Sequence, residues 1–158
     1  MAQSHYTPTI SLIIPVYNGG ENFRRCLSSV KALSPAPEEV IVVADGDSDG
    51  SGKLAEEFGM RVLRHSGSKG PAQARNLGAS NAKGVFLFFI DADVVVPSDI
   101  IERIGAAIRN DPGLDALIGS YDDEPSETNF LSQYRNLLHH YIHQTSNCLL
   151  YTSDAADE

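Results

Sequence analysis

The sequence predicts an α/β domain with a mostly parallel central sheet, and three observations indicate this fold class. Short apolar runs alternate with amphipathic helical patterns through the first 120 residues. The apolar runs have the length and β-branching of strands. The segments that follow them are polar and either glycine-rich or acidic. The expected arrangement is a parallel sheet with helices on both faces, joined by right-handed crossovers.

Five apolar runs have the properties of strands. The first two, Ile10–Val16 and Glu39–Ala44, are short and rich in β-branched residues. Met60–Arg64 is a weaker third strand. Val85–Ile90 is apolar on both faces, which predicts a central position in the sheet. Leu114–Ser120 is the expected fifth strand.

Helices are expected between and after these strands, because apolar side chains recur at helical spacing and capping residues are present. They cover residues 21–33, 54–58, 71–82, 100–108 and 129–144. Gly59 closes the second helix, and Pro71 suits the first position of the third. Asp99 and Glu102 fit the capped start of the fourth.

Composition narrows the function. The chain has 158 residues, which is enough for one domain with its own core. A net charge of −9 argues against a nucleic-acid partner, but a phosphate-bearing ligand stays open. No apolar run approaches the ~18–20 residues of a membrane span, and the N-terminus has no secretory pattern. A cytoplasmic location is therefore expected.

Two carboxylates, Asp91 and Asp93, follow the strand Val85–Ile90. Residues two apart in a strand point to the same side, so the two side chains can converge. Convergent like charges repel, and a divalent cation removes that cost. Mg²⁺ commonly takes one or two carboxylates and completes its shell with water and substrate phosphates. The pair predicts a site for a metal-bound phosphate, and a solvated turn is the alternative.

Two further polar residues follow expected strand ends or open a helix. Asp45 comes first after the second strand and could accept hydrogen bonds from a base or ribose. Arg75 lies in the first turns of the helix that starts at Pro71, where an anion is favoured. A surface arginine is an equal alternative. For Asp47, a turn residue is the preferred interpretation.

Four segments, in this order and spacing, resemble the nucleotide-sugar half of a family 2 glycosyltransferase of the GT-A fold. They are ISLIIPVYN, VIVVADGDSDGS, GPAQARNLGASNAKG and FLFFIDADVVVP, and the resemblance covers about residues 11–119. It implies a Rossmann-like three-layer sandwich with a mostly parallel sheet, incomplete on the C-terminal side. The chain departs from the family pattern at Ala44, where an acid is usual, and at Asp47, where Ser is usual.

The resemblance implies roles for residues after the first two strands. Pro15, Tyr17 and Asn18 would line the nucleotide pocket. Asp45 would bind the base, which is usually uracil. These assignments are expectations from the family pattern.

The resemblance also implies roles for residues nearer the acid pair. Arg75, with Lys69 and Gly70 nearby, would sit over the nucleotide. Asp91 would hold the ribose side of the donor. Asp93 would coordinate Mg²⁺ or Mn²⁺ on the diphosphate.

The implied activity is a metal-dependent, inverting transfer of a sugar from a nucleotide-sugar, with a UDP-sugar as the expected donor. The general base would lie in an acceptor-binding half, and no segment here matches that half. The chain is therefore interpreted as a truncated transferase. Its expected parts are a tail (1–9), a nucleotide-sugar-binding domain (10–121), a helical segment (122–146) and a second tail (147–158).

Other points stay open. The acceptor is unknown, although the segment 129–146 suggests a lipid-linked one and a parent protein at the cytoplasmic face of a membrane. A fragment that binds nucleotide and metal without transfer is the main alternative. Self-association through an exposed truncated surface is also expected. A receiver domain is excluded, because the third expected strand is followed by RHSGS rather than a lone acceptor aspartate.

Overall fold

The computed structural model of the chain describes residues 8–119 and residue 141. The chain divides into two compact units, Met1–Gly113 and Leu114–Glu158. The strands β1 to β4 and the helices α1 to α4 described below all belong to the first unit. None of the helices in the described part is long and apolar enough to cross a bilayer.

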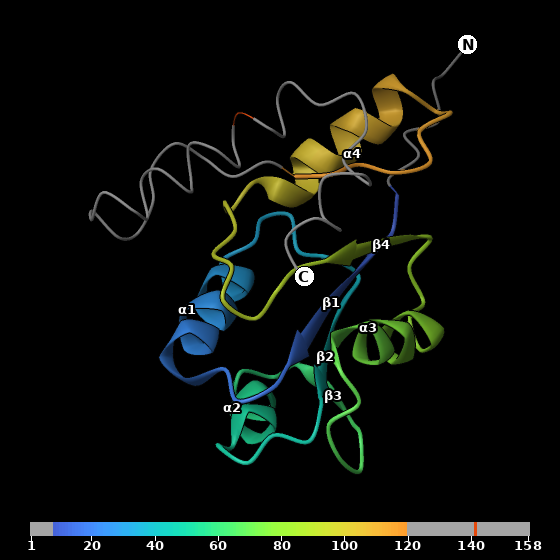
Figure 1. The fold of residues 1–158 in the computed structure, drawn as a ribbon. Helices are drawn as coiled ribbons and strands as arrows, with labels where there is room; N and C mark the ends of the chain where they lie inside the picture. Colours follow the sequence, from blue (N-terminus) through green and yellow to red (C-terminus); the bar gives the residue numbers. More distant parts are fainter. Residues whose placement is uncertain (1–7, 120–140, 142–158) are drawn as a thin grey trace. The chain divides into compact units, whose positions relative to one another are not determined.

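Four parallel strands form one sheet in the order β3-β2-β1-β4 (Figure 1). They are β1 (Ile10–Val16), β2 (Glu39–Ala44), β3 (Arg61–Arg64) and β4 (Phe86–Phe89). The predicted bounds of the first two strands are confirmed. The third and fourth strands are present but shorter than predicted.

Four helices connect and follow the strands: α1 (Gly20–Lys31), α2 (Ser51–Glu57), α3 (Pro71–Ser80) and α4 (Ile100–Asn110). Figure 1 shows α1 and α2 on one face of the sheet and α3 on the other. This arrangement confirms the predicted α/β sandwich with helices on both faces.

The alternation of side chains along β1 explains the two faces. Leu12 belongs to the apolar cluster that includes Phe23 of α1, whereas Ile13 belongs to the cluster that includes Ala74 of α3. All seven residues of β1 are buried. Apart from Ser11, the strand is apolar, as expected for a strand whose two faces are both covered.

A glycine lets α3 approach the sheet closely. A Cβ added at Gly78 would lie 2.5 Å from Cγ2 of Ile13. Any side chain at this position would push α3 away from β1. The close approach brings the N-terminal end of α3 to the loops that follow β1 and β2.

The prediction that Val85–Ile90 is a central strand is wrong for the described sheet. There, β4 is at the edge and pairs with β1 alone. Phe86 and Phe88 are half-buried, whereas Leu87 and Phe89 are exposed. Apolar residues on both faces therefore did not indicate that both faces are covered.

Two more predictions are wrong. Residues 114–119 form no strand, and Leu117 and Ile118 are each more than half exposed, so this apolar run is not buried between neighbours. Asp99 precedes α4, but its side chain makes no capping hydrogen bond. Its φ of −97° and ψ of 5° differ from the extended conformation of a capping residue.

The predicted helix over residues 129–144 lies outside the described residues except for Tyr141, which is helical. The tail at residues 147–158 also lies outside them. The predicted domain bounds stay predictions.

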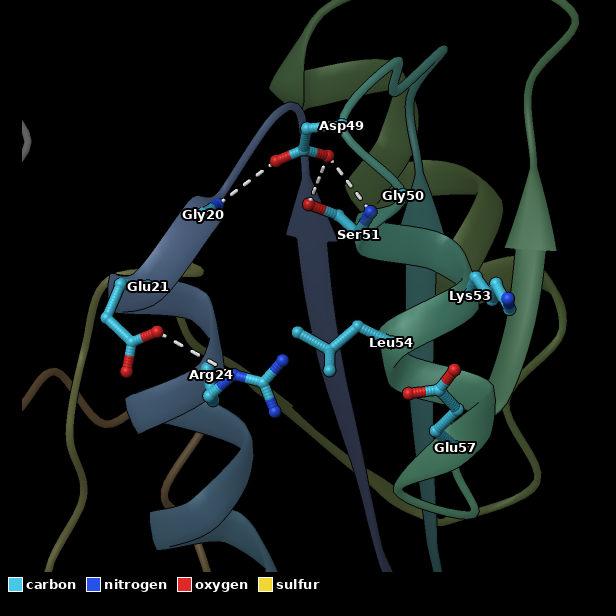
Figure 2. Close-up of a pocket in the computed structure, with 9 residues that line it drawn as sticks. All are labelled: Gly20, Glu21, Arg24, Asp49, Gly50, Ser51, Lys53, Leu54 and Glu57. Atoms are coloured by element: carbon cyan, nitrogen blue, oxygen red, sulfur yellow. Dashed lines mark hydrogen bonds and ion pairs between the residues drawn. The ribbon is translucent and has the colours of Figure 1, made fainter.

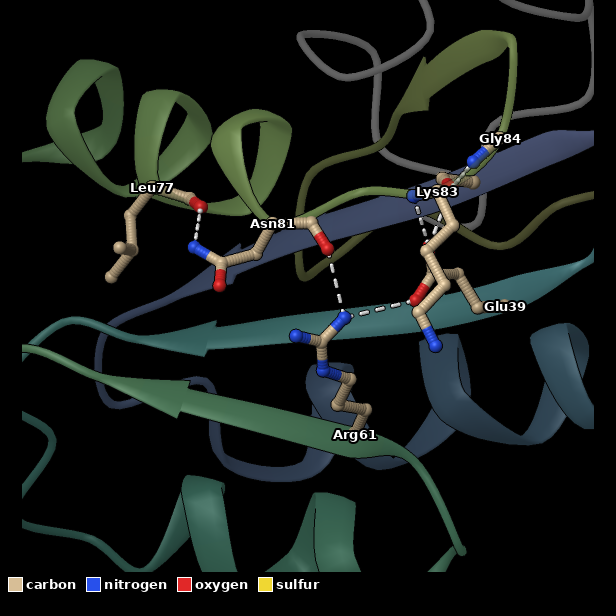
Figure 3. Close-up of polar contacts among 7 residues, drawn as sticks. Glu39, Arg61, Leu77, Asn81, Lys83 and Gly84 are labelled. Carbon is tan, nitrogen blue, oxygen red and sulfur yellow. Dashed lines mark hydrogen bonds and ion pairs between the residues drawn. The ribbon is translucent and has the colours of Figure 1, made fainter.

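A network of hydrogen bonds joins the N-terminal ends of the strands (Figure 3). The Glu39 carboxylate accepts hydrogen bonds from Ser11 Oγ at 2.8 Å, from the Lys83 backbone N–H at 2.6 Å and from Arg61 Nη1 at 3.0 Å. The Gly84 N–H donates to Ser11 Oγ at 2.8 Å. This network ties β1, β2, β3 and the segment before β4 together at the edge opposite the polar loops.

Candidate functional site

A cavity of about 200 Å³ lies at the carboxyl ends of the strands. In parallel sheets of this kind, ligands bind beyond the carboxyl ends, where the winding direction reverses. Here the reversal occurs at β1, which has β2 on one side and β4 on the other. The cavity is lined by Pro15, Val16, Tyr17, Asp45, Ser68, Gly70, Pro71, Ala74, Asp91 and Ala92.

The structure brings most of the sequence-predicted residues to this cavity. Five of them line it: Pro15, Tyr17, Asp45, Gly70 and Asp91. Pro15 lies near the end of β1, and Gly70 immediately precedes α3. The other three come from the loops that follow β1, β2 and β4. The other four predicted residues do not line the cavity, and they are described below.

The Asp45 carboxylate is almost fully buried and saturated with hydrogen bonds. It accepts from His65 Nδ1 at 2.6 Å and from Ser68 Oγ at 3.1 Å. The backbone N–H groups of Lys69 and Gly70 also donate to it, at 2.9 Å and 2.8 Å. Burial alone would raise its pKa, but these hydrogen bonds outweigh burial and hold the pKa of Asp45 at about 2. Asp45 is therefore ionised across the physiological range.

The four donors show that Asp45 organises the loop between β3 and α3. Lys69 takes part through its backbone, and its side chain is exposed. Gly46 fits beside this loop because it has no side chain: a Cβ there would lie 2.5 Å from the Ser68 nitrogen. The shape of the cavity wall thus depends on the Asp45 carboxylate.

His65 and Ser68 are site residues that the sequence analysis missed. His65 is the first residue after β3, as Asp45 is the first after β2, and its N–H donates to the Ala44 carbonyl at 3.1 Å. Position just beyond a parallel strand is the pattern that could have indicated it. Ser68 stands in a glycine-rich loop, where nothing in the sequence distinguishes it.

Arg75 reaches the cavity rim through a second charged contact. Its Nη2 donates to Asp91 Oδ1 at 2.5 Å, and both side chains are partly exposed. The cation expected over the nucleotide and the acid expected at the ribose side therefore contact each other. A nucleotide-sugar that contacts Arg75 or Asp91 must therefore join this ion pair or break it.

The acid pair lies in a turn directly after β4. The Val94 N–H donates to the Asp91 carbonyl at 3.1 Å, which closes the turn around Asp93. Both carboxylates act on the same buried thiol, Cys26. Burial chiefly raises the pKa of that thiol, to about 12, and the negative charges of Asp93 and Asp91 raise it further. Both acids therefore act electrostatically on Cys26, and their convergence on a common metal ion stays a prediction.

The carboxylates of Asp91 and Asp93 fit a divalent cation that takes most of its ligands from the phosphate groups of a bound nucleotide and from water. No cluster of three or more His, Cys, Asp or Glu side chains that could bind a metal occurs among the described residues. Asp91 and Asp93 are exposed carboxylates, and Mg²⁺ or Mn²⁺ can be bound by one or two such groups together with phosphate oxygens and water.

Asn18 is directed to another loop. Its Oδ1 accepts hydrogen bonds from the Ser48 N–H at 2.8 Å and from the Asp49 N–H at 3.3 Å. It precedes α1 with a φ of +51°, an uncommon conformation that Asn tolerates better than most residues. The side chain joins the loop after β1 to the loop after β2.

The chain matches the family model described as Glycosyl transferase family 2 over residues 11–155. It is 33% identical over 127 residues to the glycosyltransferase GlyG of Streptococcus pneumoniae serotype 4, a match that covers 77% of this chain and 42% of GlyG. It is 32% identical over 122 residues to the glycosyltransferase AglE of Haloferax volcanii, covering 73% of this chain and 40% of AglE. The chain therefore spans less than half the length of these relatives.

Solved structures share the fold. The crystal structure of S. aureus TarS 1-349 matches with a TM-score of 0.62 at 22% identity, over 78% of this chain and 42% of the chain in that structure. TarS has also been solved in complex with UDP-GlcNAc. The mannosyltransferase PcManGT from Pyrobaculum calidifontis, in complex with GDP-Man and Mn²⁺, matches with a TM-score of 0.58 at 22% identity, over 66% of this chain and 32% of that one. These likenesses confirm the fold class that the resemblance implied.

Proposed function

Because the chain belongs to glycosyltransferase family 2, we propose that the domain described here binds a nucleotide-sugar donor for a metal-dependent glycosyl transfer. The observation that carries the proposal is the cavity at the carboxyl ends of β1 and β2, lined by Tyr17, Asp45 and Asp91. Three loops far apart in the sequence meet there and supply an aromatic ring, a buried carboxylate and an exposed carboxylate. A UDP-sugar is the proposed donor.

Tyr17 and Asp45 are proposed to form the base end of the site. Tyr17 is 59% exposed at the cavity, so its ring is available for contact with a planar base. Asp45 is ionised and borders the same cavity. Since its carboxylate already accepts four donors, a base N–H would share or displace one of them.

Arg75, Asp91 and Asp93 are proposed to form the phosphate end. Arg75 supplies a permanent positive charge beside Asp91. Asp93, with Asp91 at the other side of the same turn, would hold Mg²⁺ or Mn²⁺ on the diphosphate. A bound ion of this kind stabilises the negative charge that develops on the leaving diphosphate.

The transfer itself is proposed to invert the anomeric carbon. This requires a general base on the acceptor side that deprotonates the incoming hydroxyl. No residue in the described part is assigned that role. The acceptor stays unassigned, and a lipid-linked acceptor is one candidate.

A second candidate function is nucleotide and metal binding without transfer. The observation that favours it is that the described residues at the cavity, such as Tyr17, Asp45 and Asp91, are all proposed to bind the donor, whereas no described residue is assigned as the general base that transfer requires. An assay of UDP-sugar hydrolysis separates the two functions. Hydrolysis by the chain supports a catalytic site, and binding without hydrolysis supports the second candidate.

The first test is a calorimetric titration of the full chain with UDP, in the presence and absence of Mn²⁺. We expect the Asp93→Ala variant to lose about 10-fold or more of the affinity gained from Mn²⁺, because the ion loses its protein ligand. The affinity measured without Mn²⁺ should stay unchanged.

The matched control is Asp99→Ala, which removes another exposed aspartate that makes no capping bond. It should bind UDP as the unmodified chain does. Equal Mn²⁺ dependence in the Asp93→Ala variant and the unmodified chain would contradict the metal assignment. Preferential binding of GDP over UDP would indicate that the donor carries guanine rather than uracil.

A further inference from the structure

Two loops at the carboxyl edge of the sheet are held together by a set of hydrogen bonds here termed the loop clasp, formed by Asn18, Ser48, Asp49 and Ser51. From the loop after β1, Asn18 Oδ1 accepts from the backbone N–H groups of Ser48 and Asp49. Ser48 Oγ adds a longer contact to the same oxygen at 3.4 Å. The side-chain oxygen of Asn18 therefore accepts hydrogen bonds from two backbone N–H groups of the loop after β2.

The other half of the loop clasp runs in the opposite direction (Figure 2). The Gly20 N–H donates to Asp49 Oδ2 at 3.1 Å, and the Gly19 N–H donates to Ser51 Oγ at 3.0 Å. Ser51 Oγ in turn donates to Asp49 Oδ1 at 2.6 Å. Ser51 is buried, so its contacts are partly shielded from water, whereas Asp49 and its bond to Gly20 are exposed. Three consecutive residues, 18 to 20, are thus fixed to the neighbouring loop.

The backbone at this point reverses direction in a conformation that few residues adopt. Asn18 has a φ of +51° and Gly20 a φ of +54°. Left-handed conformations cost non-glycine residues about 1 kcal/mol or more unless the surroundings hold them. The loop clasp provides that hold, because it bonds residues 18 to 20 to the loop after β2.

Tyr17 is placed between two fixed neighbours. Val16 before it is buried in β1, and Asn18 after it belongs to the loop clasp. Tyr17 itself is 59% exposed and lines the cavity. Because more than half of Tyr17 is exposed, the position of its backbone between these neighbours contributes to where its ring lies.

We propose that Asn18 and Asp49 are positioning residues that hold the Tyr17 ring at the donor cavity, and that they do not contact the donor. This inference rests on the proposed function for its effect on binding. It assigns Asn18 a role different from the pocket-lining one that the resemblance implied. It also gives Asp49 a defined task that its place in an acidic loop did not reveal.

The test compares two substitutions at position 18. Asn18→Gly permits the positive φ but removes the acceptor oxygen, whereas Asn18→Asp keeps an acceptor oxygen and tolerates the same φ. In calorimetric titrations of the full chain with UDP and Mn²⁺, we expect about 10-fold weaker binding for Asn18→Gly, because two hydrogen bonds are lost. We expect Asn18→Asp to stay within about threefold of the unmodified chain.

A double-mutant cycle with Tyr17→Ala separates positioning from general destabilisation. If Asn18 acts through the ring, Asn18→Gly in the Tyr17→Ala background should change UDP affinity by no more than about twofold. A purely structural role would weaken binding equally with and without the ring. Equal losses in both backgrounds, or normal binding by Asn18→Gly, would overturn the proposal.

Amide hydrogen exchange and the NMR resonances of Tyr17 give a readout that needs no ligand. In Asn18→Gly the amides of Ser48 and Asp49 should exchange faster and the Tyr17 ring resonances should shift, while the amides of Lys69 and Gly70 keep their rates. Failure of the unmodified chain to bind UDP would refute the proposed function alone. Unchanged Tyr17 resonances in Asn18→Gly would refute the positioning role alone.

Discussion

Strand β2 carries a buried or half-buried carboxylate at each end, and the two ends do different things. Glu39 opens the strand and Asp45 follows its last residue. Each carboxylate accepts hydrogen bonds from at least three donors. The hydrogen-bonding chemistry is therefore nearly the same at both ends.

The partners differ. Glu39 binds donors on β1, on β3 and just before β4, so it joins elements of the sheet to each other (Figure 3). Asp45 binds donors of the loop between β3 and α3, beside a cavity with Tyr17 and Asp91. A satisfied carboxylate does not by itself indicate a binding site. Its position at the carboxyl edge of a parallel sheet does.

Replacing each carboxylate by Ala gives the largest expected contrast. Asp45→Ala should lower the free energy of unfolding by about 3 kcal/mol, because it leaves buried donors without an acceptor. Glu39→Ala should cost about 1.5 kcal/mol, because its site is less buried. Urea denaturation measures both values.

Uridine binding sharpens the same comparison. Asp45→Ala should weaken uridine with or without metal, and Glu39→Ala should not, when both are titrated under conditions where the variants are folded. Unchanged uridine affinity in Asp45→Ala would move the base contact to another residue. Weaker uridine binding by Glu39→Ala would contradict the proposal that only the Asp45 end of β2 takes part in binding.

The pH dependence of stability gives the next contrast. The pKa of Asp45 is about 2 in the folded chain and 3.8 ordinarily. A depressed pKa contributes stability that is fully present above the ordinary value and is lost as the pH falls towards 2. The free energy of unfolding should therefore fall more steeply between about pH 4 and pH 2 in the unmodified chain than in Asp45→Asn. Parallel curves for the two proteins would show that Asp45 is not the group responsible.

The smallest expected contrast concerns Arg61 and His65, which contact Glu39 and Asp45 respectively. Arg61→Ala should cost about 0.5 kcal/mol, because its ion pair with Glu39 is partly exposed. His65→Ala should cost about 1.5 kcal/mol, because its contact with Asp45 is buried. In thermal denaturation, His65→Ala should therefore lower the melting temperature more than Arg61→Ala. A larger loss for Arg61→Ala would indicate that the contacts of Glu39, at the N-terminal ends of the strands, contribute more to stability than those of Asp45.

The sequence predicted the core strands well because their pattern is local. The runs Ile10–Val16 and Glu39–Ala44 are apolar, β-branched and bounded by polar residues, and the structure has the same bounds. Prediction from the sequence failed where the structure of a segment depends on which other segments pack against it. The apolar pattern of Phe86–Phe89 could not show that the described sheet ends there. Leu114–Ser120 has strand-like composition, yet residues 114–119 form no strand.

The candidate site was predicted in part. Position after a strand identified Asp45 and Asp91, and both line the cavity. The partners of these residues could not be predicted, because hydrogen bonds between distant loops leave no local pattern. His65 is 20 positions from Asp45, and Asn18 bonds an amide 30 positions away. Their roles follow only from the folded geometry.

The pairing of β1 has a consequence for synthesis of the chain. Synthesis produces β1 before both of its neighbours, since β1 pairs with the later strand β2 and its Ile10 pairs with Phe86 of β4. Every neighbour in the described sheet is reached through a helical crossover, and such distant pairings form slowly. The nascent polypeptide therefore carries a largely apolar segment without all its partners at least until Phe86 has been added, and such transiently exposed apolar surface favours aggregation before folding is complete.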